Sequence, residues 1–321
     1  MPVDRSAVRS NAKYLRQVRP IDPEEIADYI PGQPDPRVVR QVLREEAIDL
    51  SIVELTDGTF VPVEDGPLRP ATDTVDTLPD AYGDALIELL VDRWGGEWYM
   101  GESGNRLRRH IRRLKADYYQ QNQVEYDFDV ALAYAVYHLT NYYAATTYVL
   151  QNLASDGRLN RDVSVLDVGA GVGGPAMALH DVYFERDELA SPPLVEYIAL
   201  EPSDAAIVLE RMLEKTHNNF HSRIVQNTAE SFHTEREYDV IVMANVLSEL
   251  DDPVSVVETY LDHLTADGTM ILLAPADRNT SIQLRHVERE VERGGATVYG
   301  PTVRLWPGEQ PRDEGWSFDR R

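Results

Sequence analysis

The chain has 321 residues, of which 31 are Lys or Arg and 55 are Asp or Glu, so its net charge is −24, and it contains no cysteine. The missing cysteines exclude a disulfide framework, a thiolate zinc site, a cysteine-ligated iron–sulfur cluster and a cysteine nucleophile. The charge excludes a protein that binds nucleic acid or anionic lipid with its whole surface, while 43% hydrophobic residues are enough for a large core in roughly two domains.

Residues 1–66 are predicted to form a small N-terminal module. Three helical patterns and then two β-rich runs follow one another in this stretch, at residues 6–18, 23–29, 36–47, 49–55 and 59–63. Asp57 and Gly58, between the two β-rich runs, are a hairpin turn signal. Helices followed by a two-stranded wing indicate a winged-helix-like unit; an irregular cap that packs on the main domain is the alternative.

Residues 67–155 are expected to be a linker followed by helices. Pro, Thr and Asp are frequent at 66–79, which indicates an exposed loop, and helical patterns follow at 81–94 and 107–120. The stretch 130–153 has no charged residue and is long enough to span a bilayer. Because it carries five tyrosines and has no basic anchors, we expect a helix buried between domains, in a soluble cytoplasmic protein without a membrane partner.

Residues 156–321 change to short apolar strands that alternate with helical segments. The strands are expected at residues 164–168, 195–200, 223–226, 240–243 and 270–273. This alternation is the pattern of βαβ units on a parallel sheet. We therefore predict an α/β fold, in which a Rossmann-like domain with a parallel-rich sheet follows a mostly helical N-terminal region.

The sharpest local signal is the run V-L-D-V-G-A-G-V-G-G at 165–174, where a buried strand ends in a glycine-rich turn before a helix. Glycines there let backbone amides approach a ligand closely at the helix N-terminus. Gly169, Gly171 and Gly174 fit the dinucleotide pattern G-x-G-x-x-G, so NAD is one candidate ligand. Asp167 would repel a pyrophosphate but can hold a methionine ammonium group, which favours S-adenosyl-L-methionine.

The ends of two later strands extend this pattern. The next strand ends at Glu201, whose carboxylate can accept hydrogen bonds from both hydroxyls of a ribose, in NAD as well as in S-adenosyl-L-methionine. The third strand runs into N-T-A-E-S-F at 227–232, which suits the edge of an adenine. The three strand ends together therefore favour an adenosine-containing cofactor.

These motifs, together with Y-D-V-I-V-M-A-N-V-L-S-E-L-D-D-P at 238–253, resemble the successive motifs of class I S-adenosylmethionine-dependent methyltransferases over residues 160–275. The resemblance implies cofactor contacts from Asp167, Gly169, Ala170, Gly171 and Gly173 around the methionine part, Glu201 and Pro202 at the ribose, Thr228, Ala229 and Glu230 at the adenine, and Ala244 and Asn245 at the floor. Thr228 stands where many members have Asp, so the contact with the adenine amino group differs here.

The flanks of this core carry further motifs. A-Y-A-V-Y-H-L at 133–139, Y-A-A at 143–145 and V-L at 149–150 precede it, and G-A-T-V-Y-G-P at 295–301 and W-S-F at 316–318 follow it. They resemble the lead-in helix and the tail of the mitochondrial-type small-ribosomal-subunit methyltransferase-like family, a predicted rRNA methyltransferase family. The tail of that family carries cysteines for a metal cluster, which this chain lacks, so no metal site is expected. The resemblance implies a substrate in rRNA of the small ribosomal subunit or a ribosome-associated substrate.

No catalytic residue is assigned from the sequence. In-line methyl transfer can proceed by positioning alone, and the chain lacks both the D/N-P-P-Y/F motif that holds an amino nitrogen and a cysteine that attacks a pyrimidine ring. Asn245, Ser248 and Glu249 follow the fourth strand, where capping of the next helix is an alternative role. Two other functions stay open: a ribosome-assembly or RNA-binding factor with little or no activity, and an NAD-dependent oxidoreductase.

One basic helix, R-L-R-R-H-I-R-R-L-K at 106–115, stands out in the acidic chain. Leu107, Ile111 and Leu114 form an apolar stripe, which leaves the arginines on an open face. These arginines are Arg106, Arg108, Arg109, Arg112 and Arg113. We expect this face to contact RNA phosphates; pairing with the chain's own carboxylates is the alternative.

Lysine is rare: the chain has only three, Lys13, Lys115 and Lys215. An acidic, lysine-poor surface is favoured in molar salt, where charge repulsion is screened over about 3 Å. We interpret the composition as halophilic; an acidic mesophilic protein from a GC-rich genome is the alternative.

Overall fold

The computed structural model describes residues 3–69, 75–120, 122–184 and 191–300. Its N-terminal part has four helices and a two-stranded antiparallel sheet: α1 (Arg5–Leu15), α2 (Pro23–Tyr29), α3 (Pro36–Glu45), α4 (Ala47–Leu50), β1 (Ile52–Glu54) and β2 (Phe60–Pro62). Asp22 and Asp35 cap α2 and α3 by accepting hydrogen bonds from backbone N–H groups, and each is followed by a proline in the first turn. Local capping therefore fixes where these helices begin.

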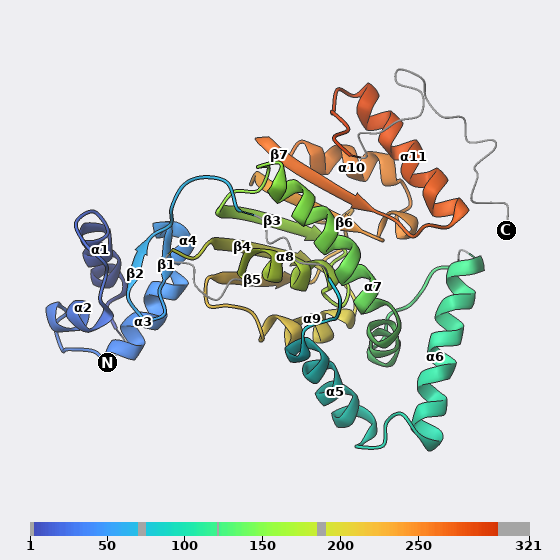
Figure 1. Ribbon diagram of the computed structural model, residues 1–321, viewed down its shortest axis with the longest axis horizontal. Helices are drawn as coiled ribbons and strands as arrows, with labels where there is room; N and C mark the ends of the chain where they lie inside the picture. Colours follow the sequence, from blue (N-terminus) through green and yellow to red (C-terminus); the bar gives the residue numbers. More distant parts are fainter. Residues whose placement is uncertain (1–2, 70–74, 121, 185–190, 301–321) are drawn as a thin grey trace.

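This N-terminal part has a hydrophobic core of its own. Val8, Leu43 and Phe60 are among its buried side chains, and Leu194 is the one core member from the rest of the chain among the described residues. The joint to the main sheet is polar: Asn219 accepts a hydrogen bond from the N–H of Glu54 at 2.8 Å and donates one to its carbonyl at 3.0 Å. The small core and the paired amide hold the N-terminal part beside the sheet (Figure 1).

Three long helices follow: α5 (Asp80–Trp94), α6 (Gly101–Gln120) and α7 (Phe128–Ser155). Leu107 and Leu114 of α6 pack with Val130 and Ala133 of α7, while the rest of α6 stands away from the sheet (Figure 1). α6 begins at Gly101, six residues before the predicted start at residue 107. The sequence did not predict this first part because it is polar and shows no apolar periodicity. No helix within the described residues is long and apolar enough to cross a membrane.

The main sheet has five parallel strands in the order β5-β4-β3-β6-β7: β3 (Asp162–Val168), β4 (Leu194–Leu200), β5 (Phe220–Val225), β6 (Tyr238–Ala244) and β7 (Leu264–Leu273). Helices α8 (Gly174–Phe184), α9 (Ala205–Leu213), α10 (Pro253–Leu261) and α11 (Arg278–Arg293) and the short 3₁₀ helix η1 (Leu247–Glu249) connect or follow the strands. This is a Rossmann-like strand order, and the predicted α/β fold is confirmed.

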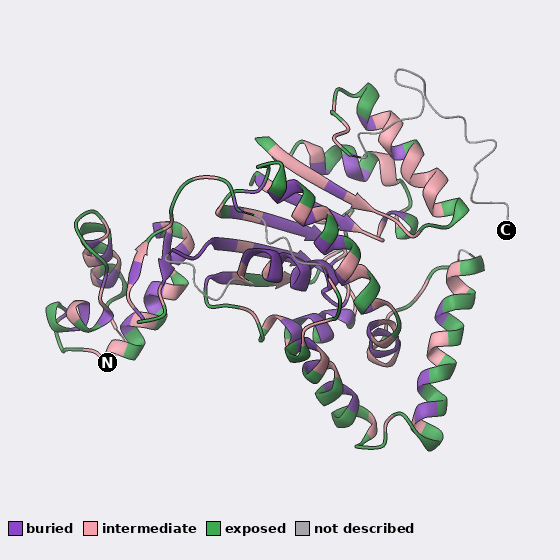
Figure 2. Cartoon of the chain, in the orientation of Figure 1, coloured by how far each residue is buried: buried purple, intermediate pink, exposed green. Residues whose placement is uncertain are grey.

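Alternation along the strands divides the core between the two sheet faces. Val163 and Val165 of β3 pack on the face covered by α5, α7, α8 and α9, and Leu166 and Val168 pack on the face covered by α10 and α11. Buried residues therefore fill both faces of the central strands (Figure 2). From β3 the chain builds β4 and β5 on one side, and it then returns to build β6 and β7 on the other side. Open α/β sheets bind ligands at the carboxyl ends of the strands that flank such a switch in strand order.

The division into residues 1–66, 67–155 and 156–321 stays a prediction. The tail motif at 316–318 and Pro301 lie outside the described residues.

Candidate functional site

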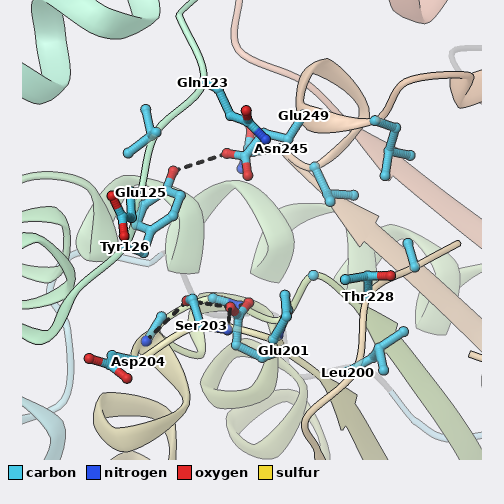
Figure 3. A pocket seen from close by; sticks show the side chains of 18 of the residues that line it. Gln123, Glu125, Tyr126, Leu200, Glu201, Ser203, Asp204, Thr228, Asn245 and Glu249 are labelled. Carbon is cyan, nitrogen blue, oxygen red and sulfur yellow. Dashed lines mark hydrogen bonds between the residues drawn. The ribbon is translucent and has the colours of Figure 1, made fainter. Parts of the chain in front are cut away.

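A cavity of about 780 Å³ opens at the carboxyl ends of β3, β4 and β6. Two groups of residues form facing sides of it (Figure 3). We name Gly169, Gly171, Glu201 and Ser203, at the ends of β3 and β4, the strand-end wall. We name residues 123–127, between α6 and α7, with Tyr134 of α7, the connection wall.

Glycine is required at the start of the turn after β3. Gly169 has φ +72°, and a Cβ there would lie 2.6 Å from Cγ2 of Val246. The N–H groups of Gly169 and Ala170 donate to the carbonyl of Leu200 at 2.8 and 3.1 Å. The turn is thus held against the end of β4, and its close approach to Val246, just after β6, leaves little room for a side chain.

Glu201 is fixed on the strand-end wall by the backbone. Its Oε2 accepts a hydrogen bond from the N–H of Gly171 at 2.8 Å, and its Oε1 accepts from the N–H of Ser203 at 2.9 Å and from the Ser203 hydroxyl. A carboxylate offers about four acceptor positions, so Glu201 retains capacity for a ligand hydroxyl. It is a buried, oriented carboxylate at the edge of the cavity.

Nine of the twelve predicted cofactor residues line this cavity: Gly169, Gly171, Glu201, Pro202, Thr228, Ala229, Glu230, Ala244 and Asn245. Ala170 lines a small adjoining space of about 20 Å³ together with Tyr134 and Tyr142. Gly173 lines neither space; it lies just before α8 with φ +93°, and a Cβ there would meet Leu209. Its role is to form the turn.

Asp167, unlike most of the predicted residues at this strand end, lines neither space. Alternation along β3 turns it to the face of Val165, where it is fully buried and accepts a hydrogen bond from the Tyr197 hydroxyl through Oδ2. Burial raises the pKa of this carboxyl to about 7, and its Oδ1 has no hydrogen-bond partner among the described residues. Asp167 therefore lies behind the cavity and not on its surface.

Sequence reasoning missed the connection wall. Tyr126 donates a hydrogen bond from its hydroxyl to Oε1 of Glu249 at 3.0 Å, and its hydroxyl also contacts that of Tyr118. The ring of Tyr126 packs edge-on against Tyr134, with centroids 5.7 Å apart. Residues 123–127 show no periodic pattern, so no local signal places them at the site.

Glu249 does not cap the following helix, because Asp252 does so by accepting from the N–H of Ser255 at 3.1 Å. The Glu249 side chain is exposed toward the cavity, which it lines opposite the strand-end wall. Desolvation by the surrounding protein raises the pKa of the carboxyl to about 7; the hydrogen bond from Tyr126 opposes the shift, and the negative charge of Glu201 adds to it.

The charge of the lining is one-sided. Among the described residues that line the cavity there are seven carboxylates and no lysine or arginine. The carboxylates are Glu125, Asp127, Glu201, Asp204, Glu230, Glu249 and Asp251. Such a lining favours a cationic or neutral ligand and disfavours phosphate groups.

The five arginines of the basic helix are exposed on α6, and Leu107 and Leu114 beneath them are buried. Arg109 pairs with Glu102 at 2.8 Å, and Arg113 lies 3.5 Å from Asp117. Some charge is thus paired within α6, and the guanidinium groups still face solvent; contact of this face with RNA stays a prediction. No group of three His, Asp or Glu side chains in the described part of the chain could hold a metal ion.

Comparison with protein families identifies the central domain. A family described as "Methyltransferase domain" matches residues 166–270, and a family described as "Domain of unknown function (DUF8157) N-terminal domain" matches residues 5–56. The first match and the strand order together show that residues 166–270 are similar to the methyltransferase domain family and have a Rossmann-like fold, as in class I S-adenosylmethionine-dependent methyltransferases. S-adenosyl-L-methionine is the cofactor of this class.

Three solved structures illustrate the likeness. The glycopeptide N-methyltransferase MtfA complexed with S-adenosyl-L-methionine is 20% identical with a TM-score of 0.28, over 34% of this chain and 46% of its own. The plantazolicin methyltransferase BpumL in complex with SAH is 15% identical with a TM-score of 0.32, over 60% and 61%. An S-adenosylmethionine-dependent methyltransferase from Clostridium acetobutylicum is 14% identical with a TM-score of 0.31, over 40% and 48%.

The chain thus spans about half the length of the solved structures it matches. A search of curated proteins gave no match to this chain. The class of the domain therefore rests on the strand order and on the family match to residues 166–270.

Proposed function

We propose that the protein is a methyltransferase that binds S-adenosyl-L-methionine in the 780 Å³ cavity and transfers its methyl group to an acceptor entering beside the connection wall. One observation carries the proposal: the glycine turn and the buried carboxylate of Glu201 are joined by the Gly171 hydrogen bond at the carboxyl ends of β3 and β4. Glu201 can accept hydrogen bonds from the ribose hydroxyls of S-adenosyl-L-methionine, and the glycine turn beside it has no side chains that would block the methionine part.

In this proposal a different group of cavity residues contacts each part of S-adenosyl-L-methionine. Gly169, Ala170 and Gly171 would lie around the methionine part, and Glu201 and Pro202 at the ribose. Thr228, Ala229 and Glu230 would face the adenine, and Ala244 and Asn245 would form the floor. Asp167 would support the methionine part from behind the turn, because its Oδ1 has no hydrogen-bond partner among the described residues and can still accept a hydrogen bond. Bound S-adenosyl-L-methionine supplies a methyl group activated by the positive charge on sulfur.

For the acceptor we propose RNA of the small ribosomal subunit or a substrate bound to that subunit. The exposed arginines of α6 support this proposal, since the chain runs from the end of α6 directly into the connection wall. The carboxylate lining means that phosphates would stay outside on α6 while a neutral group enters the cavity. We also propose a salt-rich cytoplasm as the place of action, in view of the charge of −24 with three lysines.

Transfer of a radiolabelled methyl group tests the proposal. Small ribosomal subunits from cells with and without the gene would be incubated with the protein and labelled S-adenosyl-L-methionine, and methylated positions mapped in the RNA and the proteins. Label appearing only on subunits from cells that lack the gene is expected. Cofactor binding without transfer to any subunit component would favour the assembly-factor alternative, and reduction of NAD would favour the oxidoreductase.

A further inference from the structure

We propose that Glu249 is the catalytic proton acceptor of the methyl transfer, held in place by the Tyr126 hydroxyl, and that the acceptor therefore attacks through an N–H or O–H group. This inference rests on the proposed function and deepens it. It assigns a role to a carboxylate that the cofactor contacts do not use, and it restricts the chemical class of the substrate.

The position of Glu249 carries the first step. It lies in η1, directly after β6, on the side of the cavity opposite Glu201 and Ser203 (Figure 3). Glu201 accepts from backbone donors of the strand-end wall. The one hydrogen bond to the Glu249 side chain among the described residues comes instead from the connection wall, from Tyr126 at 3.0 Å. Glu249 is thus a carboxylate on the acceptor side, with one oxygen oriented by Tyr126 and the other, Oε2, available.

The surrounding charges carry the second step. α11 packs on η1, where the amide of Gln283 donates to the carbonyl of Leu247 at 3.1 Å. No ion pair to Glu249 forms in the described part of the chain, and the titratable groups around the same cavity are acidic or phenolic. They are Glu125, Tyr126 and Asp127 of the connection, Tyr134 and Tyr142 of α7, Tyr118 of α6 behind Tyr126, Glu201 and Asp204 after β4, Glu230 after β5, and Asp251 on its own segment. With its pKa raised to about 7, Glu249 can take up a proton near neutral pH.

The chemistry carries the third step. The lone pair of the acceptor nitrogen or oxygen forms a bond to the methyl carbon, the carbon–sulfur bond breaks and its electron pair stays on sulfur, and the proton of the acceptor passes to Oε2 of Glu249. An acceptor without such a proton, such as a thioether, would give Glu249 nothing to accept. The carboxylate lining likewise keeps phosphate groups of any acceptor away from this position.

A binding experiment tests the placement of Glu249 without any acceptor. Dissociation constants of S-adenosyl-L-methionine and of S-adenosyl-L-homocysteine, which lacks the sulfonium charge, would be measured by calorimetry from pH 5.5 to 8.5. Below its pKa Glu249 is neutral, and above it the carboxylate attracts the sulfonium. We therefore expect the preference for S-adenosyl-L-methionine to rise about tenfold as the pH increases through 7, from charges several ångströms apart in a partly enclosed site.

Three variants sharpen this measurement. Glu249→Gln should remove most of the pH dependence of the preference; the Asp167 carboxyl, whose pKa is also about 7, lies behind the cavity and accounts for what remains. Tyr126→Phe should move the midpoint upward, because it removes a hydrogen bond that lowers the pKa of Glu249. Glu258→Gln, which removes an exposed carboxylate of α10 that does not line the cavity, should keep the midpoint near 7. A flat preference in the wild type, or an unchanged profile in Glu249→Gln, would overturn the inference.

Methyl transfer to small ribosomal subunits provides the second readout. The wild-type rate should rise with pH up to about 7 and then level, and Glu249→Gln should lose about 100-fold in rate together with this pH dependence. Failure of the wild type to bind S-adenosyl-L-methionine would contradict the proposed function itself. Binding with a flat pH profile would contradict the role of Glu249 alone, so the two failures are distinguishable.

Discussion

The two walls of the cavity differ in how the chain builds them. The strand-end wall forms where two neighbouring parallel strands end, and hydrogen bonds from Gly171 and Ser203 fix Glu201 there. The connection wall comes from a segment between two helices, and Tyr126 reaches Glu249 across 123 positions of the chain. The cofactor side of the cavity is therefore encoded in short local motifs, whereas the acceptor side depends on how α6 and α7 pack against the sheet.

The largest expected effect breaks the strand-end wall. Gly171→Leu should remove detectable binding of S-adenosyl-L-methionine in calorimetry, because nothing but the Gly169 carbonyl lies near its Cβ position and the side chain would enter the cavity. Gly157→Leu is the matched control, since Gly157 also has a positive φ and open space around it, away from the cavity. Both variants place a side chain on a backbone with positive φ, which costs about 1–2 kcal/mol of stability. Only Gly171→Leu should also lose the binding of S-adenosyl-L-methionine. Equal binding in both would show that the turn does not contact it.

The next effect concerns the approach to the connection wall. Reversing Arg108, Arg109 and Arg112 to Glu should remove co-sedimentation with small ribosomal subunits, because these exposed guanidinium groups would contact RNA phosphates. The affinity for S-adenosyl-L-methionine should stay unchanged, since none of the three lines the cavity. If the triple variant still co-sediments, the arginines serve ion pairs such as Arg109 with Glu102, and α6 is structural.

A smaller effect tests the anchor of the strand-end wall. Glu201→Ala should weaken S-adenosyl-L-methionine binding by about 1–3 kcal/mol, because it leaves the ribose hydroxyls and the Gly171 N–H without an acceptor. Glu196→Ala, on the same strand, removes an ion pair with Arg236 near the surface and should keep the affinity. An equal loss in the two variants would assign the effect to general destabilisation of β4.

Parts of the fold and of the site differ in how far the sequence predicts them. Apolar runs predicted all five sheet strands, although β5 begins at Phe220 instead of residue 223 and β7 at Leu264 instead of residue 270. The missed starts are mostly polar, with His221 and Ser222 in β5 and residues 265–269 in β7, so they carry no apolar signal. The position of Glu201 at the site is predictable, because it directly follows an apolar strand and the end of that strand can be located from the sequence alone. The burial of Asp167 behind the turn and the contact of Tyr126 with Glu249 depend on side-chain direction and on tertiary packing, which no spacing in the sequence reports.

The smallest and least local effect concerns the whole charged surface. The melting temperature should rise steadily along a KCl series, since screening relieves repulsion within a chain of charge −24. Circular dichroism at several KCl concentrations measures it, and the same concentrations of a neutral osmolyte provide the comparison. A melting temperature that does not respond to KCl would contradict the halophilic interpretation.

The central claim is that the cavity between the two walls holds S-adenosyl-L-methionine. Calorimetric titration of the purified protein in molar KCl with S-adenosyl-L-methionine and, separately, with NAD tests it most directly. We predict one binding site per chain for S-adenosyl-L-methionine, lost in Gly171→Leu and retained in Gly157→Leu, and no comparable binding of NAD. Equal or tighter binding of NAD, or S-adenosyl-L-methionine binding that survives Gly171→Leu, would contradict the account.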